Sequence, residues 1–181
     1  MKFIKRKKVT FLLSGGGSNL YKILNKNLTS KKFNTISIIS NNQVSKHIKE
    51  LIKSNELKIN IYEKVSNLKP KFLGDCDIVF SVGYLKKINS EIIENYEIIN
   101  LHPSLLPKYK GLMTHKRMLI NKEAKYGYSI HKVTKYLDDG EILNQNQKNM
   151  STFNENELSL NHKRLEHQFI FKDLVNFLNQ F

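Results

Sequence analysis

The middle of the chain reads Ile99-Asn100-Leu101-His102-Pro103-Ser104-Leu105-Leu106-Pro107-Lys108-Tyr109-Lys110-Gly111. The preceding residues, 96–99, lead into it as a predicted strand. Because side chains alternate along a strand, Asn100 and His102 would lie on one face at its carboxyl end, the edge where open α/β sheets bind ligands. The stretch thus predicts an amide beside an imidazole. The alternative is that Asn100 begins a turn and His102 packs beside Pro103.

An amide beside an imidazole suits acyl transfer. A carbonyl under attack develops negative charge on its oxygen, which needs fixed hydrogen-bond donors, and the attacking group must lose a proton. Asn100 can donate, and His102 can donate or move a proton. The pair is therefore a candidate catalytic centre.

Toward the N-terminus, the apolar run 9–13 predicts a strand, and 20–24 predict a helix. Between them lies Ser14-Gly15-Gly16-Gly17-Ser18-Asn19. A glycine loop between a strand and a helix can hold a phosphate on backbone N–H groups. The loop has neither the Walker A pattern nor the dinucleotide-binding spacing. A tight turn with Ser18 or Asn19 as the helix cap is the alternative.

The rest of the chain alternates between predicted strands and helices, which favours a parallel sheet. Strands are expected at 33–40, 58–62, 77–83, 126–134 and 142–145, and helical segments at 43–53, 114–122 with Thr114 as cap, and 156–181. The final segment carries an apolar stripe of Leu158, Leu165, Phe169, Leu174, Val175 and Leu178. The connection 63–75 shows little helical periodicity.

Composition favours one domain, 1–181, with 40% apolar residues for its core. The sequence shows no signal segment or membrane span, so we expect a cytoplasmic protein without membrane partners. The net charge of +14 favours anionic partners such as nucleic acid, phosphates or polyanionic cofactors. Its lysines are scattered without interleaved aromatic residues, so nucleic acid is not expected. Cys76 is expected to be buried, and the spread-out histidines predict no metal site.

The string Asn100–Pro107, followed by Gly111-Leu112 and Thr114-His115, resembles the folate-dependent formyltransferase family. Three other segments support the resemblance: the glycine loop, the Gly127-x-Ser129-x-His131 strand with the turn after it, and Glu166-His167. The resemblance implies an α/β fold with a three-layer Rossmann-like open sheet, mostly parallel with an antiparallel strand near one edge, and helices on both faces.

The resemblance also implies the site residues. Catalysis is assigned to Asn100, His102 and Asp138, substrate binding to Gly16, Gly17, Ser18, Asn19 and Glu166, and folate binding to Tyr84, Leu85, Lys86, Ile88 and again Asp138. Two segments leave an alternative open. Residues 84–88 can be read as a surface turn with solvated lysines, and Glu166 as a solvated helix residue. Lys86 and Lys87 depart from the family pattern at positions that contact folate.

The reaction implied is transfer of a formyl group from 10-formyltetrahydrofolate to the amine of glycinamide ribonucleotide, in de novo purine biosynthesis. In this scheme Asp138 keeps His102 protonated and relays a proton. No metal is needed. Association of the protein into a homodimer is one alternative to a monomer. One alternative is a related enzyme that formylates another amine, such as a nucleotide-linked amino sugar. The other is a non-catalytic folate-binding relative. Transfer to initiator tRNA is disfavoured, because such enzymes carry a further C-terminal domain.

Overall fold

Four parallel strands form the sheet of the first of two units, which extends to Ile98. The computed structural model describes residues 6–180, and the second unit begins at Ile99. The single domain 1–181 remains a prediction. The first unit contains β1 (Lys8–Leu13), α1 (Ser18–Ser30), β2 (Asn34–Ser40), α2 (Lys46–Ser54), β3 (Asn60–Tyr62), α3 (Pro70–Leu73), β4 (Ile78–Ser81) and α4 (Ser90–Asn95). Its strand order is β3-β2-β1-β4.

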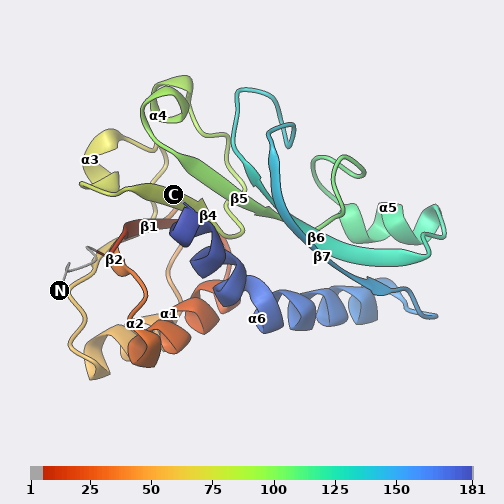
Figure 1. The fold of residues 1–181 in the computed structure, drawn as a ribbon, viewed down its shortest axis with the longest axis horizontal. Coiled ribbons are helices and arrows are strands. Elements are labelled where there is room, and N and C mark those ends of the chain that lie inside the picture. The colour runs from red at the N-terminus through yellow and green to blue at the C-terminus, as the bar shows by residue number, and fades with distance from the viewer. Residues whose placement is uncertain (1–5, 181) are drawn as a thin grey trace. The chain divides into compact units, whose positions relative to one another are not determined.

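The core of this unit is built around β1, which is buried from Val9 onward. The ring of Phe11 lies 6.1 Å, centroid to centroid, from the rings of both Phe33 and Phe80. Helices α1 and α2 lie side by side on one side of the strands, and α3 and α4 lie on the other (Figure 1). Helices cover both faces because parallel strands are apolar on both faces.

The turn into α1 depends on Gly17. Its φ of 69° is left-handed, and a Cβ there would lie 2.6 Å from Ile48 Cδ1 and 2.9 Å from Leu13 Cδ1. Gly17 is also the N-cap of α1, and no side chain caps the helix. The alternative with Ser18 or Asn19 as cap is therefore wrong, because the left-handed glycine makes the turn.

Two short helices flank β4. In the connection 63–75, α3 is a single turn, as the missing periodicity predicted. Helix α4 was not expected from the sequence. It is six residues long, and Asn89 caps it by accepting a hydrogen bond from the Ile92 amide at 3.0 Å.

The second unit contains an antiparallel sheet covered by a long helix. Strand β5 (Ile98–His102) begins at the boundary and is followed by α5 (Thr114–Ile120), β6 (Lys125–Lys132), β7 (Ile142–Asn149) and α6 (Glu155–Gln180). Strand β6 is antiparallel to both β5 and β7. Helix α5 begins after Met113, which is left-handed, so the prediction that Thr114 caps it is wrong.

Helix α6 packs on β6 and β7 and contacts α5. Four residues of its predicted apolar stripe are buried: Leu158, Leu165, Leu174 and Leu178. Phe169 and Val175 are only half-buried, whereas the polar residues His162, Glu166 and Asp173 are buried. Position 181, the predicted end of this helix, lies outside the described residues. Between residues 6 and 180, no helix combines the length and apolar character needed to cross a membrane.

Candidate active site

The register of β5 and β6 gathers four polar side chains on one face of the second unit. Asn100 pairs with His131, and His102 pairs with Ser129. Paired residues of antiparallel strands point to the same face, so the predicted placement of Asn100 beside His102 is confirmed. Ile130, between Ser129 and His131, faces the other way.

Asp138 joins this group from the turn between β6 and β7. Its Oδ2 lies 3.3 Å from His102 Nδ1, and its Oδ1 lies 3.5 Å from His131 Nε2. The side chains of His102 and Asp138 are 6% and 10% exposed. The structure therefore brings the three predicted catalytic residues together and adds His131 as a fourth.

The two ring nitrogens of His102 have different partners. Nε2 lies 2.9 Å from the backbone carbonyl oxygen of Tyr109, which can only accept a hydrogen bond. Nε2 therefore carries a proton, and in the neutral imidazole Nδ1 has a lone pair facing Asp138. Nδ1 is thus the nitrogen that can take up a proton and then donate.

Burial lowers the pKa of His102 below its ordinary value. The Tyr109 carbonyl and the Asp138 carboxylate act in the opposite direction, and His131 and Arg117 add to the lowering. The sequence-based expectation was that Asp138 keeps His102 charged. In the structure Asp138 favours the imidazolium, but burial outweighs it.

The backbone of Asp138 is left-handed, with φ at 47°. Aspartate adopts this conformation more readily than most residues. The Gly111 amide donates to Asp138 Oδ2 at 2.8 Å. Burial acts to raise the pKa of the Asp138 carboxyl, but contacts with His131, the Gly111 amide and the His102 ring bring it below its ordinary value. The neighbouring Asp139 instead pairs with Lys110, and its side chain is 52% exposed.

Asn100 is oriented by His131. His131 Nδ1 lies 2.8 Å from the Lys132 carbonyl oxygen, to which it donates. In the neutral ring, Nε2 then accepts a hydrogen bond from Asn100 Nδ2 at 3.2 Å. An amide nitrogen carries two hydrogens, so Asn100 retains one for a ligand oxygen.

Ser129 holds the chain that follows β5. Its hydroxyl donates to the Ser104 carbonyl at 2.7 Å and accepts from the Leu106 amide at 2.9 Å. Gln145 Nε2 also donates to this hydroxyl, at 2.8 Å. Ser129 therefore fixes the loop beyond His102.

In the first unit, Ser14 joins the glycine loop to the segment predicted to bind folate. The Ser14 amide donates to the Gly83 carbonyl at 2.9 Å, and its hydroxyl accepts from the Leu85 amide at 2.7 Å. Asn42 Nδ2 donates to the Ser14 carbonyl at 2.6 Å. Two of the predicted binding segments, 16–19 and 84–88, are thus tied together.

The predicted folate-binding residues differ in exposure. Leu85 is 71% exposed, and Lys86 and Lys87 are also exposed. Burial raises the pKa of the half-buried Tyr84. Ile88 is buried in the core of the first unit, so it anchors the segment 84–88 and is not exposed to a ligand. An exposed leucine next to two lysines fits a ligand with an aromatic part and carboxylates.

Glu166 lies on α6 in the second unit. It is 8% exposed on α6, one turn after His162, so it is not the solvated residue of the alternative interpretation. Tyr128 is buried on β6 between Gly127 and Ser129. Burial and then the Asp173 carboxylate raise the pKa of Tyr128, and the charge of Glu166 adds a smaller effect in the same direction. Because Tyr128 and Ser129 alternate, Tyr128 points away from the His102 face.

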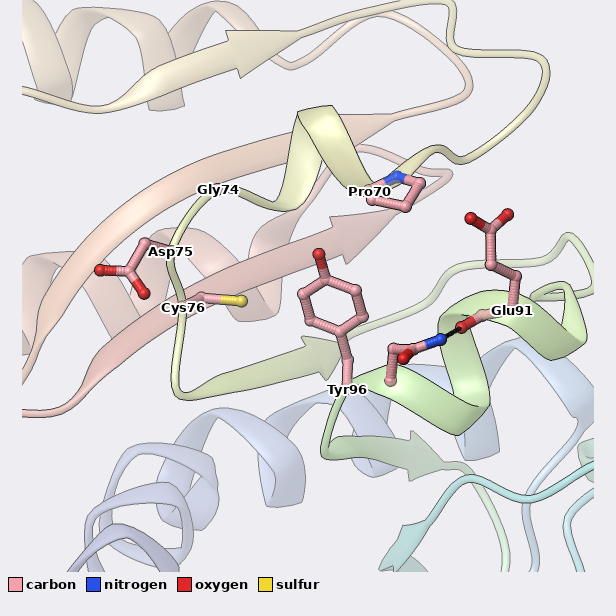
Figure 2. A pocket seen from close by; sticks show the side chains of 7 residues that line it. Pro70, Gly74, Asp75, Cys76, Glu91 and Tyr96 are labelled. Atoms are coloured by element: carbon pink, nitrogen blue, oxygen red, sulfur yellow. Dashed lines mark hydrogen bonds between the residues drawn. The ribbon is translucent and has the colours of Figure 1, made fainter.

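A separate hollow of about 480 Å³ lies in the first unit, between the residues that precede β4 and helix α4. Figure 2 shows the Cys76 thiol pointing toward Tyr96, while the Asp75 carboxylate points the other way. Cys76 is half-buried here, so the prediction of a buried residue is wrong. Ligands of open sheets bind at carboxyl ends, which separates this hollow from the candidate site.

Sequence reasoning missed three contributors to the site: His131, the Tyr109 carbonyl and the Gly111 amide. A signal for His131 was present, because it lies two residues after Ser129 and so shares one strand face with it. The two backbone groups had no such signal, since every residue has a carbonyl and nearly every residue an amide.

Comparison with known proteins places nearly the whole chain in one family. The family described as formyl transferase matches residues 7–174. A phosphoribosylglycinamide formyltransferase of Escherichia coli K12 is 29% identical over 149 residues, covering 76% of this chain and 70% of that protein. A chloroplastic phosphoribosylglycinamide formyltransferase of Vigna unguiculata is 31% identical over 160 residues. That match covers 78% of this chain but only about half, 51%, of the relative.

Solved structures show the same fold. The phosphoribosylglycinamide formyltransferase of Coxiella burnetii matches with a TM-score of 0.83 and 25% identity, over 97% of this chain and 89% of that one. The predicted fold class is confirmed: parallel strands, an antiparallel strand near one edge, and helices around the sheet.

Proposed function

The chain belongs to the formyl transferase family, and on that premise we propose that it transfers a formyl group from 10-formyltetrahydrofolate to the amine of glycinamide ribonucleotide. The observation that carries the proposal is the convergence of Asn100, His102 and Asp138 within one cluster around the buried His102. Two similar proteins are named for this reaction, which supports this amine substrate. The reaction would belong to de novo purine biosynthesis, in the cytoplasm.

The residues of the second unit can perform the chemistry of this transfer. As the amine attacks, the formyl oxygen gains negative charge, and Asn100 Nδ2 has a hydrogen to donate to it. When Nδ1 is protonated, the positive charge of His102 also stabilises that oxygen. The attacking amine loses a proton and the departing folate nitrogen gains one, and Asp138 can carry this proton directly or through a water.

Folate and ribose phosphate would bind to the first unit. Leu85 and the two lysines fit the co-substrate, and the exposed Gly16 leaves open space where a Cβ would stand. The first turn of α1 has no acidic residue, so its N-terminal amides suit a phosphate. The role of Glu166 in substrate binding remains part of the proposal.

The test is an assay with the purified protein, 10-formyltetrahydrofolate and one amine at a time. The amines are glycinamide ribonucleotide and a panel of nucleotide-linked amino sugars. We expect formylation of glycinamide ribonucleotide alone, and its loss in His102→Asn. Formylation of an amino sugar instead would support the related enzyme. Folate binding without any turnover would support the non-catalytic relative.

A further inference from the structure

The segment 108–112 supplies two backbone groups to the catalytic pair. The Tyr109 carbonyl oxygen lies 2.9 Å from His102 Nε2, and the Gly111 amide donates to Asp138 Oδ2 at 2.8 Å. These groups are two residues apart on one loop. A displacement of the loop would therefore change the partners of both side chains together.

Arg117, on α5, holds this loop from outside. Its guanidinium donates to the Lys110 carbonyl at 2.7 Å and to the Leu112 carbonyl at 3.3 Å. The guanidinium carbon also lies 5.2 Å from the centroid of the Tyr109 ring. Arg117 thus contacts the loop at positions on both sides of Gly111. A planar group with several donors makes such joint contacts, and a lysine ammonium cannot reproduce them.

The Tyr109 hydroxyl anchors the same loop to the chain after α5. It donates to Glu123 Oε1 at 2.7 Å and accepts from Asn121 Nδ2 at 2.9 Å. Lys108 Nζ contacts the Glu123 carboxylate at 3.0 and 3.2 Å. Tyr109 itself has a left-handed backbone, with φ at 59°. A tyrosine rarely adopts that conformation without support, and these contacts provide it.

We propose that Arg117 and Tyr109 are positioning residues that keep the Tyr109 carbonyl on His102 Nε2, so that Nδ1 is the nitrogen available for proton transfer. The proposal rests on the proposed function for its catalytic meaning. Its structural content, the tautomer of His102, can be measured without substrate.

The charges around His102 decide which variants are informative. Asp138 raises its pKa, whereas the charge of Arg117 and, when that ring is protonated, the charge of His131 lower it. A neutral replacement of Arg117 would change the pKa through charge alone. Arg117→Lys keeps the charge and loses the planar group. Tyr109→Phe keeps the ring and the carbonyl and loses only the hydroxyl.

The experiment measures the ring nitrogen shifts of His102 by NMR against pH, with the resonance assigned through His102→Asn. In the wild-type protein we expect the neutral ring to be protonated on Nε2. In Arg117→Lys and in Tyr109→Phe we expect a mixture of tautomers and a lower His102 pKa, because the carbonyl that favours the imidazolium is less well held. Arg164→Lys on the exposed face of α6 and Tyr62→Phe on β3 are the matched controls.

Kinetics give a second measurement. We expect kcat to fall about tenfold in both variants, with KM nearly unchanged, since positioning errors act mainly on the chemical step. A wild-type tautomer and pKa in either variant would remove that residue from the proposal, even if its melting temperature fell. Lack of activity toward glycinamide ribonucleotide in the wild-type protein would overturn the proposed function and leave the NMR result to be judged separately.

Discussion

Asp138 combines a left-handed backbone conformation with contacts to the Gly111 amide, His102 and His131. Its left-handed φ turns the carboxylate toward His102, while Asp139, the next residue, points to Lys110. Asparagine tolerates the same backbone conformation, so Asp138→Asn should fold normally. The substitution removes the charge and the capacity to accept a proton.

We expect Asp138→Asn to lower kcat by about 10²-fold or more, the scale of lost acid–base catalysis, with substrate binding largely kept. Asp139→Asn should stay near wild type, because its side chain is half exposed. Steady-state kinetics of the two variants check this. A severe defect in Asp139→Asn with a mild one in Asp138→Asn would mean that the wrong aspartate has been assigned.

At the scale of elements, two glycines of the loop before α1 have different roles, one in folding and one in the proposed binding. Gly17 has no room for a Cβ, whereas a Cβ on Gly16 meets nothing within 4 Å. A substitution at Gly17 would therefore damage the turn itself, and it could not report on a ligand. Gly16 is the informative position.

We expect Gly16→Val to weaken binding of glycinamide ribonucleotide by about tenfold or more, because its side chain would occupy the space of the phosphate. Folate binding and the melting temperature should change little. Titration calorimetry with each ligand measures the two affinities, and Gly17→Val serves as the comparison that loses stability. Equal weakening for both ligands would exclude the loop as a phosphate site.

The same elements show what sequence patterns can predict. The alternation of side chains placed Asn100 beside His102 correctly, because both residues lie on β5 and its pairing with β6 fixes which face each side chain occupies. The predicted helix cap at Thr114 was wrong, and so was the alternative that Ser18 or Asn19 caps α1. Both helices begin after a left-handed residue, and at Met113 nothing in the residue type indicates that conformation. The loop carbonyl on His102 depends on the folded path of 103–109, which local patterns do not determine.

At the scale of the whole molecule, a buried histidine links stability to pH. His162 is buried next to the Tyr126 ring, with its Nδ1 at 2.9 Å from His115 Nε2. Burial and the neighbouring His115 lower the pKa of His162 to about 3. The unfolded chain binds a proton at this histidine below its ordinary value of 6.5, and the folded protein does not. The contribution of neutral His162 to the free energy of unfolding is therefore complete above pH 6.5 and is lost as the pH falls toward 3.

Between pH 6 and 4 we expect the free energy of unfolding to fall by about 1.4 kcal/mol per pH unit from this one group. His162→Gln removes the titration, so its stability should depend less steeply on pH by that amount. Urea unfolding at a series of pH values measures both slopes. Parallel curves for the two proteins would show that His162 does not titrate between the folded and unfolded states as described.

The hydrogen bonds of Ser14 have a thermodynamic consequence for the two proposed ligands. Its amide and hydroxyl connect the glycine loop to the Gly83–Leu85 segment, so one loop cannot shift without affecting the other. A ligand that fixes one loop also partly orders the other loop. The second ligand then loses less conformational entropy when it binds. The gain is reciprocal, since a coupling free energy between two binding events has a single value. Formyl donor and acceptor would then assemble cooperatively on the enzyme, each recruiting the other by the same factor.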